Sequence, residues 1–131
     1  MKISSKGRYA VRVMSELAKN QGTLVSVSEI SKKQDISIKY LEQICALLAS
    51  AKLIESVRGP SGGYRLSINS KECSVADILQ ATGDLPKIAP CLENGNQCPR
   101  KSRCNSIGYW EELSGLIVNY LKSIKLTDLV T

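Results

Sequence analysis

The most informative part of the sequence is the segment Ser26-Val-Ser-Glu-Ile-Ser-Lys-Lys-Gln-Asp-Ile-Ser-Ile-Lys-Tyr-Leu-Glu-Gln43. Ser26 and Glu29 have the spacing of a capping box, in which each side chain bonds a free backbone N–H at the start of a helix, here residues 27–34. A tight turn follows, and Ser37 caps a second helix over residues 38–51. Two capped helices separated by a short turn form the helix-turn-helix pattern.

The sequence on both sides of this segment completes a recognisable domain. Apolar residues at helical spacing predict a first helix over residues 6–20. Residues 53–58 and 64–67 have the composition of short strands, and the glycine-rich turn between them predicts a hairpin. A capping box over residues 74–77 opens a helix that ends at Gly83. We therefore predict a mainly α fold with a small β wing, a winged helix-turn-helix in residues 1–83.

Basic residues are concentrated in this predicted domain. The net charge of the chain is +6, but residues 1–71 hold 12 Lys/Arg against 5 Asp/Glu, whereas residues 72–131 hold 6 against 7. A positively charged half favours binding to a polyanion, and nucleic acid is the strongest candidate.

The predicted helices and wing suit double-stranded DNA. The second helix of such a motif fits the major groove with its N-terminal residues toward base edges, while the first rests on the backbone. A glycine-rich wing that carries an arginine suits the narrow minor groove. An ordinary helical hairpin is the alternative, but the wing and the charge asymmetry agree with DNA binding. The residues predicted to contact DNA are Lys32, Lys33, Ser37, Lys39, Tyr40, Glu42, Gln43, Arg58, Gly59, Ser61 and Gly62.

Three of the five cysteines lie in residues 84–104, a segment with proline and glycine that we predict to be a loop. Cys91, Cys98 and Cys104 have the spacing C-x6-C-x5-C. Thiolates suit iron–sulfur clusters, Cu(I) or zinc, but zinc sites usually have closely paired cysteines and four donors. We predict an iron–sulfur cluster here, with redox-active thiols as the alternative. Cys45 and Cys73 are expected to be small buried or semi-exposed side chains, not ligands.

A long helix is predicted over residues 105–124, followed by a tail to residue 131. Positions that alternate between intervals of three and four have the spacing of a coiled-coil seam, and here they are Ile107, Trp110, Ser114, Ile117, Leu121 and Ile124. Leu113, Leu116 and Tyr120 widen this seam. So much apolar surface on the terminal helix of a small chain predicts a homodimer. The predicted interface residues are Ile107, Trp110, Leu113, Ile117, Leu121 and Ile124.

Composition narrows the class of protein further. An apolar content of 43% indicates a globular chain, and neither a run of about eighteen apolar residues nor a signal-like N-terminus is present. We therefore predict a cytoplasmic protein with reduced thiols and no membrane partner. The chain has no histidine and no recognisable nucleophile–base pair. We therefore predict that the protein is not an enzyme and has no small-molecule substrate.

Several of these segments resemble one known family. They are residues 1–10, residues 36–43, the wing sequence Val57-Arg-Gly-Pro-Ser-Gly-Gly-Tyr64, the cysteine loop and residues 110–130, which together resemble the IscR-type iron–sulfur cluster regulators. The resemblance implies a dimeric winged-helix repressor or activator that controls genes for cluster assembly. It also implies a cluster, usually 2Fe–2S, held by Cys91, Cys98 and Cys104. The resemblance also suggests a role for Glu42, because in IscR-type proteins a glutamate in the stretch matching Leu41-Glu-Gln43 lets the cluster-free form reject one class of DNA site. A solvated helix residue is the alternative for Glu42.

The sequence departs from this family at one position. The IscR type has a histidine ligand three residues after the third cysteine, where this chain has Ile107. The candidates for the fourth ligand are a carboxylate such as Glu93 or Asp84, a group of the partner subunit, a small thiol and water. A 4Fe–4S cluster is the alternative cluster type, as in related nitric-oxide- and iron-sensing branches. Some of those take an acidic ligand from the first helix, where this chain has Arg8.

A nitric-oxide or iron sensor of the same family is one alternative to the sensing of cluster status. Two further alternatives do not involve sensing through a cluster. One is a cluster-free regulator of redox-thiol or cysteine metabolism that binds DNA. The other is an electron carrier, which would need four firm ligands and no DNA-reading half.

Overall fold

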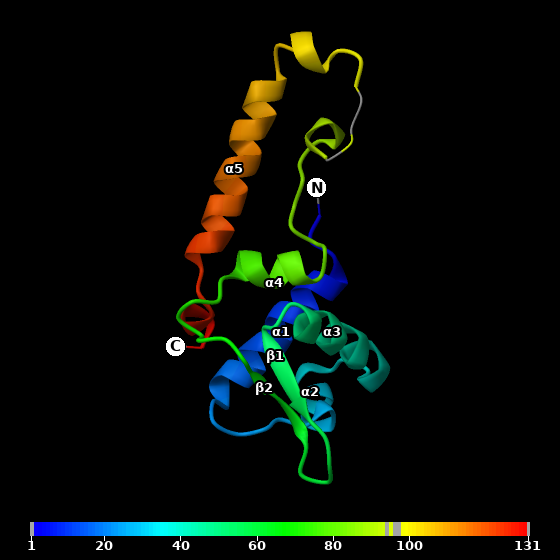
Figure 1. Ribbon diagram of the computed structural model, residues 1–131, viewed down its shortest axis with the longest axis vertical. Helices are drawn as coiled ribbons and strands as arrows, with labels where there is room; N and C mark the ends of the chain where they lie inside the picture. Colours follow the sequence, from blue (N-terminus) through cyan, green and yellow to red (C-terminus); the bar gives the residue numbers. More distant parts are fainter. Residues whose placement is uncertain (1, 94, 96–97, 131) are drawn as a thin grey trace.

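The computed structural model describes residues 2–93, 95 and 98–130. Figure 1 shows a helical body with a two-stranded wing at one end and a long helix that projects from the other. The elements are α1 (Ser5–Lys19), α2 (Val27–Gln34), α3 (Ile38–Ser50), β1 (Ile54–Val57), β2 (Gly63–Leu66), α4 (Val75–Ala81) and α5 (Ile107–Ser123), with short 3-10 helices at Pro90–Leu92, Lys101–Arg103 and Leu126–Leu129. The predicted mainly α fold with a small β wing is confirmed.

Side-chain caps start both helices of the helix-turn-helix. The Ser26 hydroxyl accepts the Glu29 N–H at 3.1 Å, and the Ser37 hydroxyl accepts the Tyr40 N–H at 3.2 Å. Between them Asp35 ends α2 in the left-handed conformation, with φ 54° and ψ 47°, which Asp tolerates better than most residues. The Glu29 carboxylate lies 3.8 Å from Lys33 Nζ instead of completing the capping box that the sequence predicts. The predicted box over residues 74–77 does form in full.

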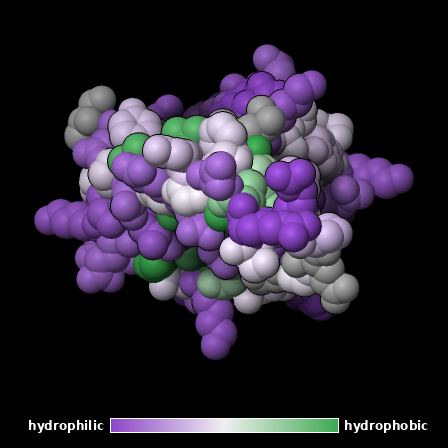
Figure 2. All heavy atoms as spheres, turned by 90° about the horizontal axis from the view of Figure 1, so that it is seen from above, coloured by the Kyte–Doolittle hydropathy of each residue, from purple (hydrophilic) through white to green (hydrophobic). Residues whose placement is uncertain are grey.

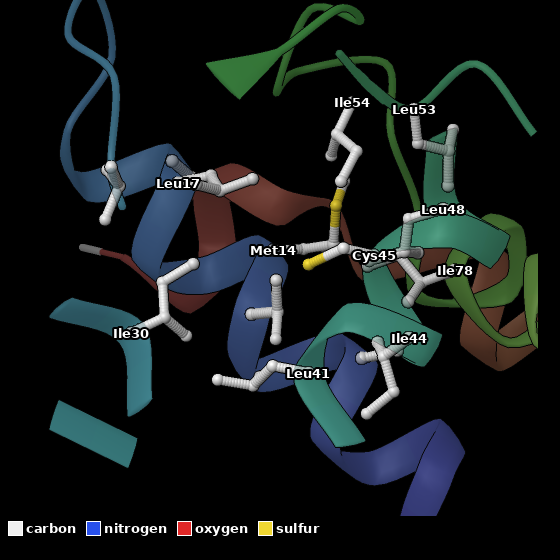
Figure 3. Packing of buried hydrophobic residues seen from close by; sticks show 14 of the residues in the cluster. Met14, Leu17, Ile30, Leu41, Ile44, Cys45, Leu48, Leu53, Ile54 and Ile78 are labelled. Atoms are coloured by element: carbon white, nitrogen blue, oxygen red, sulfur yellow. The ribbon is translucent and has the colours of Figure 1, made fainter. Parts of the chain in front are cut away.

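The hydrophobic core lies where α1, α3 and β1 meet. Met14 of α1 and Ile44 and Leu48 of α3 are fully buried, and Figure 3 shows them packed with Cys45 and Ile54. This packing uses one face of α3 and leaves the other face toward solvent. Burial of each such side chain contributes about 1.5–3 kcal/mol, so the core holds α3 firmly on α1.

The wing is an antiparallel hairpin in which Ile54 pairs with Leu66 and Val57 pairs with Gly63. The Gly62 N–H donates to the Gly59 carbonyl at 3.0 Å to close its turn. A Cβ on Gly62 would lie 2.1 Å from the Val57 carbonyl oxygen, so the turn requires glycine at that position.

The C-terminal half of α5 packs against α4, while its N-terminal half projects away from the body (Figure 1). After α5 the chain returns to the body. The Leu126 N–H donates to the Cys73 carbonyl at 2.8 Å, and the Leu126 side chain is fully buried in the main core. The tail after α5 is therefore part of the packing of the N-terminal domain. None of the helices in the described residues is long and apolar enough to cross a membrane.

Candidate nucleic-acid interface and cysteine loop

The first turns of α3 present a polar face to solvent. Lys39, Glu42 and Gln43 are exposed, and so is the capping residue Ser37. Together they place a cation, a carboxylate, an amide and a hydroxyl within two turns of one helix. Such a set offers both donors and acceptors to base edges in a major groove.

Tyr40, also predicted to contact DNA, differs from these residues because it is half-buried. Its ring meets the ring of Tyr9 on α1 edge to face, with centroids 5.7 Å apart and planes at 73°. Aromatic pairs of this geometry are favourable beyond the area that they bury. Tyr40 therefore packs the start of α3 against α1, which is a structural role separate from any contact with DNA.

The two lysines predicted on the supporting helix α2 have different surroundings. Lys32 is exposed. Lys33 Nζ lies 3.9 Å from a carboxylate oxygen of Glu16 and 3.8 Å from one of Glu29. Its charge is therefore partly matched within the chain, and Lys32 is the freer of the two cations for a phosphate.

The predicted wing residues lie at the exposed end of the hairpin. Arg58, Gly59 and Ser61 are exposed, and Gly62 is half-buried. The turn end of the wing, including Arg58, Gly59 and Gly62, borders a groove of about 450 Å³ with the start of α2. On the return strand Arg65 Nε donates to Glu55 Oε1 at 2.5 Å, so this charge is paired along the hairpin.

The described parts of the cysteine loop lead from the end of α4 to the end of α5 that is farthest from the wing (Figure 1). Cys91 and Cys104 are half-buried and Cys98 is exposed. Among the residues that the structure describes, no three cysteine or acidic side chains are gathered closely enough to hold a metal ion.

Cys104 has surroundings that favour its thiolate form. Its Sγ lies 3.3 Å from the Ser106 hydroxyl, and this hydrogen bond, helped by backbone N–H groups and by Arg100, holds the pKa of Cys104 below its ordinary value. A lower pKa gives more thiolate at neutral pH, and the thiolate is both the nucleophile and the metal ligand.

The two other cysteines are buried, within the range that the sequence predicts for them. Burial, with a smaller effect of Glu42, raises the pKa of the Cys45 thiol to about 12. Burial, with a smaller effect of Asp77, raises the pKa of the Cys73 thiol to about 11. Both act as small apolar side chains in the core.

The exposed apolar surface on α5 coincides only in part with the seam that the sequence predicts. Among the predicted interface residues, Leu121 is 9% exposed and Ile117 and Ile124 pack with it against α4, while Ile107 is half-buried. The end-on view in Figure 2 shows hydrophobic patches between hydrophilic side chains. The large apolar residues left exposed on α5 are Tyr109, Trp110, Leu113, Leu116 and Tyr120, 42–70% accessible.

A polar network that was not predicted from the sequence joins α1 to α2. Arg12 donates to the side chain and to the carbonyl of Gln34, and Gln34 donates in turn to the buried Glu16 at 2.7 Å. A glutamate on the apolar face of the predicted first helix was the available signal, because a buried carboxylate needs polar partners.

Comparisons with known proteins agree with this geometry. Residues 3–131 match the family model Rrf2, described as an iron-dependent transcriptional regulator. The regulator IscR of Vibrio parahaemolyticus is 38% identical over 100% of this chain and 78% of its own length. The structure of CymR, the global cysteine regulator of B. subtilis, matches with a TM-score of 0.79 and 31% identity over 99% of this chain and 96% of that one. The structure of T. potens IscR matches with a TM-score of 0.74 and 34% identity over 99% of this chain and 86% of that one.

The thiol surroundings predict an order of reactivity. Alkylation requires the thiolate, so at pH 8 Cys104 should react with iodoacetamide well before Cys45 or Cys73, which should react only after unfolding in guanidinium. Mass spectrometry of peptides after timed quenching measures each rate. Ser106→Ala should move the pH midpoint of the Cys104 reaction upward, because it removes the hydrogen bond that favours the thiolate. Equal native rates at Cys45 and Cys104 would contradict this order.

Proposed function

Because the chain belongs to the Rrf2 family of transcriptional regulators, we propose that it is a DNA-binding regulator whose state is set by an iron–sulfur cluster on Cys91, Cys98 and Cys104. The main observation behind the proposal is that one chain contains both a winged helix-turn-helix and a segment with three cysteines. A helix-turn-helix with a basic wing stands at one end, and three cysteines lie in one segment beside α5 at the other (Figure 1). The regulated genes would include those for cluster assembly.

The DNA-reading surface is proposed to consist of the exposed face of α3, the start of α2 and the wing. Lys39 and Gln43 would face base edges, Lys32 would approach a phosphate, and Arg58 would enter the adjacent minor groove. The exposure of all four side chains supports this assignment.

The donor chemistry of the cysteine loop fits a cluster. Three thiols in one segment, one of them with a lowered pKa, are the soft ligands that iron–sulfur clusters use. When bound, a 2Fe–2S cluster, or a 4Fe–4S cluster as the alternative, would supply a redox-active centre sensitive to iron supply and oxygen. The three cysteines would hold it, and the basic residues between Cys98 and Cys104 would offset its negative charge.

The fourth ligand is proposed to be an oxygen donor, a small thiol or a group from a second subunit, since Ile107 replaces the histidine of the IscR type. Glu93 is exposed and lies two residues from Cys91. Asp84 is less available, because its Oδ2 is buried and lies 3.1 Å from where a Cβ on Gly7 of α1 would be. Of the two carboxylates, Glu93 is therefore the better candidate.

The regulator is proposed to act as a homodimer through α5. A strip of exposed tyrosine, tryptophan and leucine on a projecting helix is the surface that a second copy would cover. The proposed interface therefore centres on the exposed side of the predicted seam, where Leu116 and Tyr120 lie.

A cluster-free regulator of redox-thiol or cysteine metabolism is the second candidate. It is favoured by the structural similarity to CymR, with a TM-score of 0.79, and by the separation of the cysteines in the described residues. The two candidates share the DNA-reading half and differ in what the cysteine loop binds.

The DNA assignment predicts a steep dependence on salt. Affinity for a duplex selected in vitro from a random pool should fall by orders of magnitude between about 50 and 200 mM salt, because bound cations release counterions. Lys39→Ala and Arg58→Ala should each cost about 1–3 kcal/mol of binding, measured by fluorescence anisotropy. Lys122→Ala on α5 removes the same charge from an exposed site outside this surface and serves as the control. Affinities equal to that control would overturn the proposed surface.

The cluster assignment predicts a coloured protein. Anaerobically purified or reconstituted chain should absorb visible light, bleach in oxygen, and lose its chromophore on Cys91→Ala, Cys98→Ala or Cys104→Ala. Cys73→Ala should keep the chromophore and serves as the matched control. Iron analysis, giving about two or about four atoms per cluster, identifies the cluster type. A colourless protein that still binds its selected duplex would favour the cluster-free candidate.

The α5 assignment predicts that Leu116→Asp gives monomers in sedimentation velocity. A charge at this exposed position would be desolvated in the interface, where it lacks a partner. Ile117 is a less suitable probe because it packs against α4 of its own chain. Lys122→Gln makes the same change in net charge on another face of the helix and should stay dimeric. A dimer that tolerates Leu116→Asp at micromolar concentration would place the interface elsewhere.

A further inference from the structure

A chain of contacts surrounds the turn between α2 and α3. On α1, the Arg12 guanidinium donates through Nε to Gln34 Oε1 at 2.8 Å and through Nη2 to the Gln34 carbonyl. Gln34 is the last residue of α2, so this cation also lies at the negative end of the helix dipole. One planar side chain therefore ties α1 to the end of the supporting helix.

The same guanidinium contacts the start of the reading helix through a neighbour. Its central carbon lies 5.1 Å from the centre of the Tyr9 ring, and the Tyr9 ring packs edge to face with Tyr40 in the first turn of α3. Arg12 is thus linked both to the end of α2 and, through Tyr9, to the beginning of α3. These are the two sides of the turn whose geometry sets the angle of the reading helix.

Gln34, which accepts these hydrogen bonds from Arg12, is itself held in a fixed orientation. The Gln34 amide donates to Glu16 at 2.7 Å, so its orientation is determined by bonds at both ends. Glu16 is 5% exposed and lies within 3.9 Å of Lys19 and Lys33, which balance its charge. A satisfied polar network of this kind specifies one arrangement of the helices that it joins.

We propose that Arg12 is a positioning residue for the DNA-reading helix, and that it sets discrimination between specific and non-specific DNA. The inference rests on the proposed function, because it takes α3 as the helix that reads DNA. Base contacts require the reading helix to be placed accurately, whereas phosphate contacts tolerate small displacements and carry no sequence information directly. If the first turn of α3 could shift slightly, affinity for a preferred sequence would therefore fall more than affinity for non-specific DNA.

Arg12→Lys is the variant that tests this role. Lysine keeps the charge but has no planar fork, so it cannot bond both oxygens of Gln34 and stack over Tyr9 at once. Arg8→Lys is the matched control, because it makes the same exchange one turn earlier, at an exposed arginine that donates to Ser5. The probes are a duplex selected in vitro by the unmodified chain and a scrambled duplex of the same composition.

The expected result is a fall of about tenfold in the ratio of the two affinities for Arg12→Lys, the scale of one mismatched base pair. The ratio should be unchanged for Arg8→Lys, and the salt dependence on scrambled DNA should be the same for all three proteins. Gln34→Met, which removes the acceptor and keeps the length, should lower the ratio in the same direction and replaces Arg12→Lys if that variant does not fold.

Three outcomes would overturn the inference. An unchanged ratio with a lower melting temperature would make Arg12 a stabilising residue only. If Arg12→Lys lowered the affinities for both duplexes equally and made the salt dependence shallower, Arg12 would be a phosphate contact. An unmodified chain that does not distinguish the selected from the scrambled duplex would reject the proposed function, and this inference with it.

Discussion

The polar face of α3 depends on the burial of the opposite face. Leu41, Ile44, Cys45 and Leu48 are inaccessible to solvent and pack against α1 and the first strand of the wing. Because this packing fixes how α3 is rotated about its own axis, it also determines which side chains remain outside. The exposure of Lys39, Glu42 and Gln43 is therefore a consequence of the core, and the wing, whose β1 begins with the buried Ile54, is held by the same cluster.

Local signals in the sequence account for most of the elements. Ser26, Ser37 and Ser74 each cap the helix that was predicted to follow, since a capping side chain acts on a backbone N–H three residues away. The hairpin was predictable for a similar reason, because a turn that excludes a Cβ at Gly62 requires glycine. The boundaries of α1, α3 and α5 differ from the predicted ones by one or two residues, as helix ends commonly do.

Contacts between distant residues account for what the sequence did not reveal. The heptad spacing on α5 indicated an apolar surface correctly but could not show that Ile117 and Leu121 pack on α4 of the same chain. Nor could spacing alone show that Arg12 bonds Gln34, 22 positions further along. The cysteine spacing gives the donor types, whereas the distances between the thiols depend on a loop whose conformation is not determined by local signals.

The return of the chain after α5 bears on how the protein is made. Leu126 is fully buried in the main core of the N-terminal domain, yet it is translated after the cysteine loop and α5. During synthesis the ribosome therefore releases the cysteine loop and α5 before the core of the N-terminal domain can close. A chain interrupted within α5 would lack this core residue and leave apolar surface for proteases to recognise. Only a chain that includes Leu126 can complete this core, so shorter products are left open to degradation.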